Sequence, residues 1–147
     1  RVRPQIAVGA VGEQTDAGCL ALRGQAGKEQ SIVVGEGTKR EADFAFDAGF
    51  SNSGSVSGDK LNTLQQFAIL AAQHGMLWVG SAEPSGFNMK EHTWADATNR
   101  GGYWLGVGAH SPVDASPEEA PVEGELETGR RLGERVAKAA ARWVKGA

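Results

Sequence analysis

Residues 44–79 constrain the fold more than any other part of this 147-residue chain. The segment begins with apolar residues at every second position, Phe44, Phe46, Ala48 and Phe50, a pattern typical of a strand with one strongly apolar face. A small-polar loop at residues 51–58 follows, and then a helix predicted over residues 60–74. The apolar run at residues 76–79 predicts a strand buried on both faces of a parallel sheet. This order of elements predicts an α/β unit.

The predicted helix carries signals at both of its ends. Asp59 is expected to cap its N-terminus, and Gly75 to supply the left-handed residue that stops it after His74. Its apolar stripe consists of Leu61, Leu64, Ala68, Ala71 and Ala72, with Phe67 beside it.

The C-terminal part continues the alternation of strands and helices. Residues 80–101 form a long polar excursion, of the kind that is often functional, and residues 103–109 predict a further strand. A proline-rich, acidic surface linker at residues 111–125 leads to a helix at residues 127–144, whose apolar face contains Leu132, Val136, Ala139, Ala140 and Trp143. We therefore expect a doubly wound parallel sheet in three layers.

The first 43 residues give weaker signals. A short buried strand is predicted at residues 5–11, a short helix from Cys19 that Gly24 and Gly27 interrupt, and a strand at residues 31–34. We interpret residues 1–147 as one domain, with an atypical segment at 1–43 and the recognisable part at 44–147.

The composition excludes several classes of protein. A hydrophobic share of 40%, a charged share of 22% and a net charge of -3 indicate an ordinary globular chain and favour no nucleic-acid partner. A single cysteine, Cys19, cannot form an intramolecular disulfide. Neither a signal-peptide core in the first twenty residues nor a window of membrane-spanning length is present, so we expect a cytoplasmic protein.

The sequence contains none of the common catalytic motifs. It lacks GxGxxG, Walker A, HExxH and GxSxG, and His74, His92 and His110 have no metal-like spacing, so neither a catalytic residue nor a metal site is assigned. The small-polar loop at 51–58 has two interpretations. It is either a plain strand-to-helix connection, or a ligand loop whose N–H and hydroxyl groups hold polar ring edges or phosphate oxygens. His74 by itself is explained by its place at a helix C-terminus.

Three runs of sequence together resemble the WrbA-type flavodoxin-like family. They are AGFSNSGSVSGDKLNTLQQ at residues 48–66, QHGMLWVG at residues 73–80 and NRGGY at residues 99–103. The resemblance implies an FMN-dependent NAD(P)H:quinone oxidoreductase with a flavodoxin-like fold, a quinone substrate and a homo-oligomer, dimer or tetramer. It also implies that flavin contacts come from His74, at the isoalloxazine edge, and from the loop residues Asn52, Ser53, Gly54, Ser55, Val56 and Ser57.

The N-terminal third departs from this family. Neither the Ser/Tyr/Gly/His phosphate loop nor the Pro-Thr-aromatic-Gly flavin loop is visible in residues 1–43, and Glu13 and Asp16 would repel a phosphate. The sheet is therefore expected to be incomplete at its N-terminal side. Either the gene product is truncated or rearranged, or the sequence is out of frame until about Phe44. The alternative function is a non-catalytic flavodoxin-like remnant that acts as an interaction or structural subunit.

Overall fold

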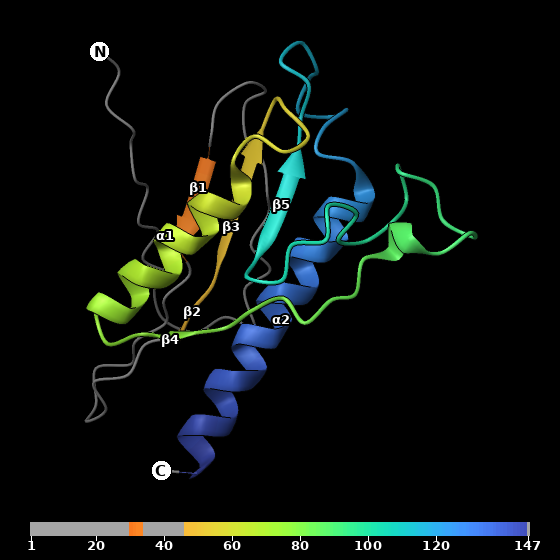
Figure 1. The fold of residues 1–147 in the computed structure, drawn as a ribbon. Coiled ribbons are helices and arrows are strands. Elements are labelled where there is room, and N and C mark those ends of the chain that lie inside the picture. The colour runs from red at the N-terminus through yellow and green to blue at the C-terminus, as the bar shows by residue number, and fades with distance from the viewer. Residues whose placement is uncertain (1–29, 34–45, 147) are drawn as a thin grey trace, which may run out of the picture.

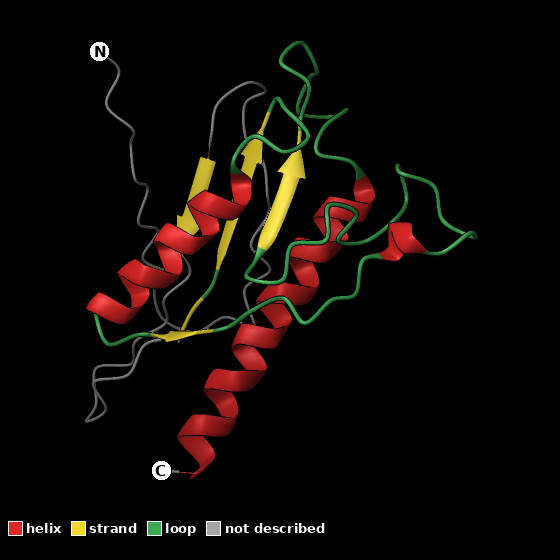
Figure 2. Ribbon diagram, viewed as in Figure 1, coloured by secondary structure: helices red, strands yellow, loops and turns green. Residues whose placement is uncertain are grey.

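The computed structural model describes residues 30–33 and 46–146 (Figures 1 and 2). The strand predicted at residues 5–11, the helix predicted from Cys19, and Phe44 lie outside the described residues. The elements are, in chain order, β1 (Gln30–Val33), β2 (Phe46–Asp47), β3 (Gly49–Ser53), α1 (Lys60–Gln73), β4 (Leu77–Trp78), the 3-10 turn η1 (Gly86–Asn88), β5 (Val107–His110) and α2 (Glu123–Gly146).

Two parallel strand pairs connect residues 46–53 with residues 77–110. In the larger sheet β3 lies between β1 and β5, and it runs parallel to β5 with Phe50 opposite Val107 and Ser53 opposite His110. In the smaller sheet β2 runs parallel to β4. The strand predicted at 31–34 is present as β1, but it is antiparallel to β3. The predicted α/β class is confirmed, and the arrangement is compatible with an incomplete flavodoxin-like fold.

The helices α1 and α2 cover opposite faces of the β3–β5 sheet. Ala48 and Phe50 belong to the core cluster that includes Leu132 and Val136 of α2. Gly49 faces the other way, because a Cβ atom built on it would lie 2.9 Å from the Phe67 ring of α1. Since successive residues of a strand point to opposite faces, the fold has three layers, as predicted (Figure 1).

The helix α1 ends where the sequence predicts but begins differently. His74 is its C-terminal cap residue, and Gly75 has the left-handed φ of 68° that was expected of it. Asp59 does not cap the helix as predicted, because it has a φ of 53° and its side chain makes no capping hydrogen bond. The predicted apolar stripe is also partly wrong: Leu64 is fully buried, whereas Leu61 is 49% exposed and Lys60 takes the inward position.

Strand boundaries were harder to predict. β3 continues through Ser53, although a loop was predicted from residue 51, because pairing with β1 and β5 on its two sides supports the polar residues as strand. β4 has only two residues and is half-buried, so the prediction of a strand buried on both faces was wrong. α2 begins at Glu123, four residues before the predicted start, and two acidic residues in its first turn favour that start.

Asp47 is a buried carboxylate that should make stability depend on pH. Its side chain has no exposed surface, and within the described residues neither carboxylate oxygen has a hydrogen-bond partner. Burial raises the pKa of Asp47 to about 6, and the nearby backbone amide of Ala48 lowers the pKa only in part. Because the folded-state pKa exceeds the unfolded value, folding favours the protonated form, and stability is lost as the pH rises through about 6.

We expect Asp47→Asn to stabilise the fold at pH 8 by about 2 kcal/mol, because it removes the buried charge but keeps the shape. Urea unfolding at pH 8 and pH 5 measures this effect. The advantage of the variant over the wild type should shrink by about 1 kcal/mol at pH 5, where Asp47 is largely protonated. Identical pH dependence in the two proteins would show that Asp47 is not the buried charge responsible.

Candidate functional site

Residues 54–58, here called the 54–58 loop, lie at the carboxyl end of β3, next to the carboxyl end of β5 (Figure 1). Ligands of α/β sheets bind at this edge of the strands. Gly54, Ser55, Val56 and Ser57 are all exposed, whereas the strand residues that lead into the loop are buried. The loop is therefore held at its base and presented to solvent.

The carbonyl groups of the loop point inward, to the side chain of Lys60. The Lys60 Nζ atom donates to the carbonyl oxygens of Ser55 at 2.5 Å, Val56 at 2.9 Å and Ser57 at 3.4 Å. Lys60 is only 1% exposed, although it is the first residue of α1. A buried ammonium group thus fixes three successive peptide groups of the loop.

Two further side chains also contact carbonyl groups of the loop. The Tyr103 hydroxyl lies 3.5 Å from the Val56 carbonyl oxygen and 3.3 Å from that of Ser57. The His110 Nε2 atom lies 3.2 Å from the Gly54 carbonyl oxygen, and because a carbonyl only accepts, this bond requires the proton of His110 to be on Nε2. Burial, and to a lesser degree the charge of Glu125, raise the pKa of Tyr103, so its hydroxyl remains a donor.

The N–H groups of the loop consequently point outward. In a planar trans peptide the C=O bond and the following N–H bond point in opposite directions, so the inward carbonyls of residues 54–57 turn the N–H groups of residues 55–58 away. Across residues 46–146, no group accepts a hydrogen bond from these four amides. A run of oriented, unused N–H groups is suited to a ligand with acceptor oxygens or negative charge.

The structure divides the site residues predicted at 52–57 into two groups. Gly54, Ser55, Val56 and Ser57 form the exposed loop, while Asn52 and Ser53 belong to β3. The Asn52 amide is buried and exchanges hydrogen bonds of 3.0 and 3.1 Å with the Ser111 hydroxyl, so it fastens β3 to the end of β5. Ser53 Oγ donates to the Ser55 carbonyl oxygen at 3.1 Å, and so supports the loop from beneath.

His74 lies apart from the 54–58 loop. It caps the opposite end of α1, and the 14 residues of that helix span about 21 Å. Its side chain is exposed. The structure therefore does not bring His74 and the loop of the same chain together.

The sequence interpretation missed Lys60, Tyr103 and His110. A signal for Lys60 exists, because a cation in the first turn of a helix is disfavoured by the helix dipole and so requires another explanation. Tyr103 and His110 carry no such local signal. They reach the loop from positions 46 and 56 residues away in the sequence.

A buried ion pair braces the β5 side of the site. Arg100 Nε and Nη2 each lie 2.8 Å from Glu125 Oε1, and both side chains are almost fully buried. The same oxygen accepts a hydrogen bond of 2.9 Å from the His110 amide. Burial raises the pKa of Glu125, and the Arg100 guanidinium acts in the opposite direction. Glu125 thereby connects α2 to the strand that carries His110.

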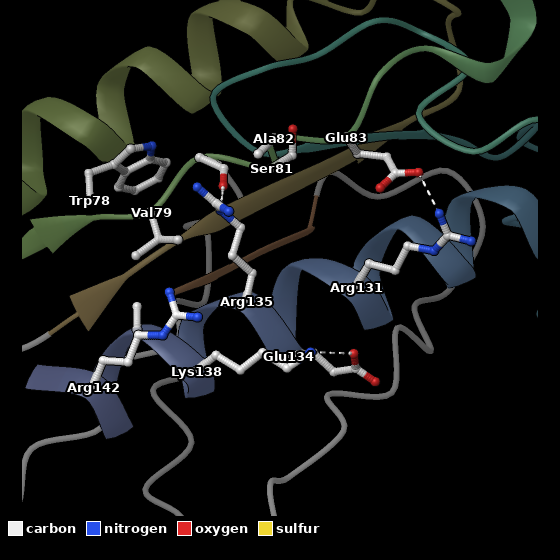
Figure 3. Close-up of a pocket in the computed structure, with 12 residues that line it drawn as sticks. Trp78, Val79, Ser81, Ala82, Glu83, Arg131, Glu134, Arg135, Lys138 and Arg142 are labelled. Carbon is white, nitrogen blue, oxygen red and sulfur yellow. Dashed lines mark hydrogen bonds and ion pairs between the residues drawn. The ribbon is translucent and has the colours of Figure 1, made fainter. Parts of the chain in front are cut away.

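A basic groove lies elsewhere, between α2 and residues 78–83, with a volume of about 560 Å³ (Figure 3). Arg131 forms an ion pair of 2.6 Å with Glu83, and Arg135 Nε donates to the Gly80 carbonyl oxygen at 3.0 Å. These contacts fasten α2 to the segment after β4.

Over the described residues there is no cluster of three side chains that could bind a metal ion, and no helix with the length and apolarity needed to cross a membrane.

Comparison with known proteins gives one informative match. No protein-family model matches the chain, and no solved structure matches it significantly. Flavodoxin FldP of Pseudomonas aeruginosa (strain UCBPP-PA14) is 39% identical over 90 residues, which cover 61% of this chain and 47% of the relative. The chain thus matches about half the length of this relative. The similarity supports a flavodoxin-like protein, but not the WrbA type in particular.

Proposed function

We propose that this chain is an FMN-binding redox protein and that the 54–58 loop forms part of its flavin site. The observation that carries the proposal is the run of outward N–H groups at residues 55–58, fixed from behind by Lys60, Tyr103 and His110. The similarity to a flavodoxin and the place of the loop at the carboxyl ends of β3 and β5 support it.

The residues present fit a flavin. The outward amides are donors for the acceptor oxygens of FMN, and the exposed hydroxyl groups of Ser55 and Ser57 add further donors. Val56 is 56% exposed and supplies apolar surface beside them. Asn52 and Ser53 would act from the strand, by keeping the base of the loop in place.

We propose quinone reduction by NAD(P)H as the reaction. FMN, when bound, supplies the two-electron chemistry between the nicotinamide and the quinone, so the protein needs no dedicated acid or base. The chain itself would bind and orient the flavin and shield one side of it through the loop.

An assay of the FMN-loaded chain with NADH or NADPH and benzoquinone tests this reaction. FMN-dependent quinone reduction is the expected result. Flavin binding without turnover would remove the quinone-reductase assignment and leave the flavoprotein. A chain that binds no flavin would instead favour the non-catalytic structural subunit.

We further propose a homo-oligomer, dimer or tetramer, in which His74 of one copy contacts the flavin of another. Leu61, Ile69 and Leu70 leave apolar surface exposed on α1, at 49%, 52% and 38%. His74 lies at the end of the same helix, too far from the loop of its own chain.

His74→Ala should therefore weaken FMN binding about threefold, through one lost hydrogen bond, and leave the fold intact because the side chain is exposed. Flavin titration, together with mass measurement by light scattering, tests both proposals. A monomeric mass, or an unchanged FMN affinity in an oligomeric protein, would remove His74 from the site.

A further inference from the structure

We propose that Lys60 is the positioning residue of the 54–58 loop. Its ammonium group holds the loop carbonyls inward and thereby aims the N–H groups of Val56, Ser57 and Gly58 at an acceptor-rich group of the ligand. This inference rests on the proposed flavin site, and it assigns to that site a residue that lies beneath the loop instead of on its surface.

The ammonium group of Lys60 donates to three carbonyl groups of the loop. A lysine ammonium has three N–H bonds, and the carbonyl oxygens of Ser55, Val56 and Ser57 lie within 3.4 Å of Nζ. A buried charge without such partners would be strongly unfavourable. Turning the loop carbonyls outward would therefore remove three hydrogen-bond acceptors from the buried Lys60 ammonium group.

Helix stability does not explain a lysine at this position. Lys60 opens α1, whose N-terminus already carries partial positive charge, and no acidic residue lies in its first turn. The partial positive charge of the helix N-terminus lies behind amides that are themselves donors, so the two effects attract the same kind of group. That group bears negative charge or acceptor oxygens.

FMN offers such a group at two places, the phosphate and the oxygen-bearing edge of the flavin ring. Riboflavin has the ring edge but lacks the phosphate. Comparison of FMN with riboflavin therefore shows whether the loop binds the phosphate or the oxygen-bearing ring edge.

The test compares Lys60→Met, which keeps the length of the side chain and removes its charge and donors, with the control Lys90→Met, which removes an exposed lysine. Quenching of flavin fluorescence gives the Kd. We expect Lys60→Met to weaken FMN binding at least about tenfold, and Lys90→Met to change it less than about twofold. Equal weakening for riboflavin would identify the ring edge, and weakening for FMN alone would identify the phosphate. An FMN affinity unchanged in folded Lys60→Met would overturn the proposal.

Amide spectra of the flavin-free protein separate this inference from the proposed function. In 1H–15N spectra, Lys60→Met should shift the amides of residues 55–58 and leave those of α2 in place. If the wild type binds no FMN but these shifts occur, the proposed flavin site is refuted, and the role of Lys60 in orienting the 54–58 loop is supported. Unchanged loop amides would refute the positioning role.

If Lys60→Met does not fold, the wild-type protein decides. Because Lys60 turns the N–H groups of residues 56–58 toward the ligand, addition of FMN should shift these three amide signals more than those of α2. FMN binding that leaves these amide signals in place would overturn the proposal.

Discussion

Replacing Arg100 by methionine is expected to lower the free energy of unfolding by about 3–5 kcal/mol. The substitution removes both nitrogen contacts to Glu125 Oε1 and leaves a carboxylate buried without its counter-ion. It also removes the hydrogen bond from Arg100 to the Trp94 carbonyl oxygen and the guanidinium that lies 4.6 Å from the Trp94 ring centre. Urea unfolding measures the loss.

The double variant Arg100→Met/Glu125→Gln is the matched control. It removes both charges, while the glutamine oxygen can still accept the hydrogen bond from the His110 amide. We expect it to recover more than half of the stability that Arg100→Met loses. A loss below about 1 kcal/mol in the single variant would mean that the pair contributes little, as exposed ion pairs do.

Gly58→Ala is expected to lower the free energy of unfolding by about 2–3 kcal/mol and to weaken FMN binding about tenfold. Gly58 has a φ of 50°, which disfavours any side chain. A Cβ atom there would also clash with Ser53 Oγ and lie 3.1 Å from the Ser55 carbonyl oxygen. The loop would have to move, and with it the N–H groups that it presents.

Gly75→Ala separates the backbone effect from the effect on the loop. Gly75 has a similar φ of 68°, but a Cβ atom there would have nothing within 4 Å, and it lies at the other end of α1. Gly75→Ala should lower the free energy of unfolding by about 1 kcal/mol and leave FMN affinity unchanged. Equal effects of the two substitutions on FMN binding would contradict the assignment of the site to the loop.

The parts of the fold that local chemistry controls were predictable from the sequence. Gly75 ends α1 because only glycine adopts its backbone conformation easily, and the 3.6-residue pattern located α2. The end of β3 was not predictable. Ser51, Asn52 and Ser53 have the composition of a loop, and only their pairing with β1 and β5 makes them a strand.

The direction of β1 was not predictable from the sequence, and the sequence marks Lys60 only as an unusual residue at the start of a helix, without showing its role. The short pattern at residues 31–34 does not show whether the partner strand runs parallel or antiparallel, so this strand was expected to fit the parallel sheet. The inward position of Lys60 depends on the orientation of three loop peptides, and no residue pattern specifies that orientation. The loop itself was identified from its small residues and from a resemblance.

Titration of the purified chain with FMN tests the central claim most directly. Flavin fluorescence and the visible spectrum report whether the ring enters a protein site. We predict saturable quenching at one FMN per chain, with a shifted visible spectrum, and weaker binding by Gly58→Ala than by Gly75→Ala. Flavin that stays fully fluorescent, with the spectrum of free FMN, would contradict the claim that the 54–58 loop forms a flavin site.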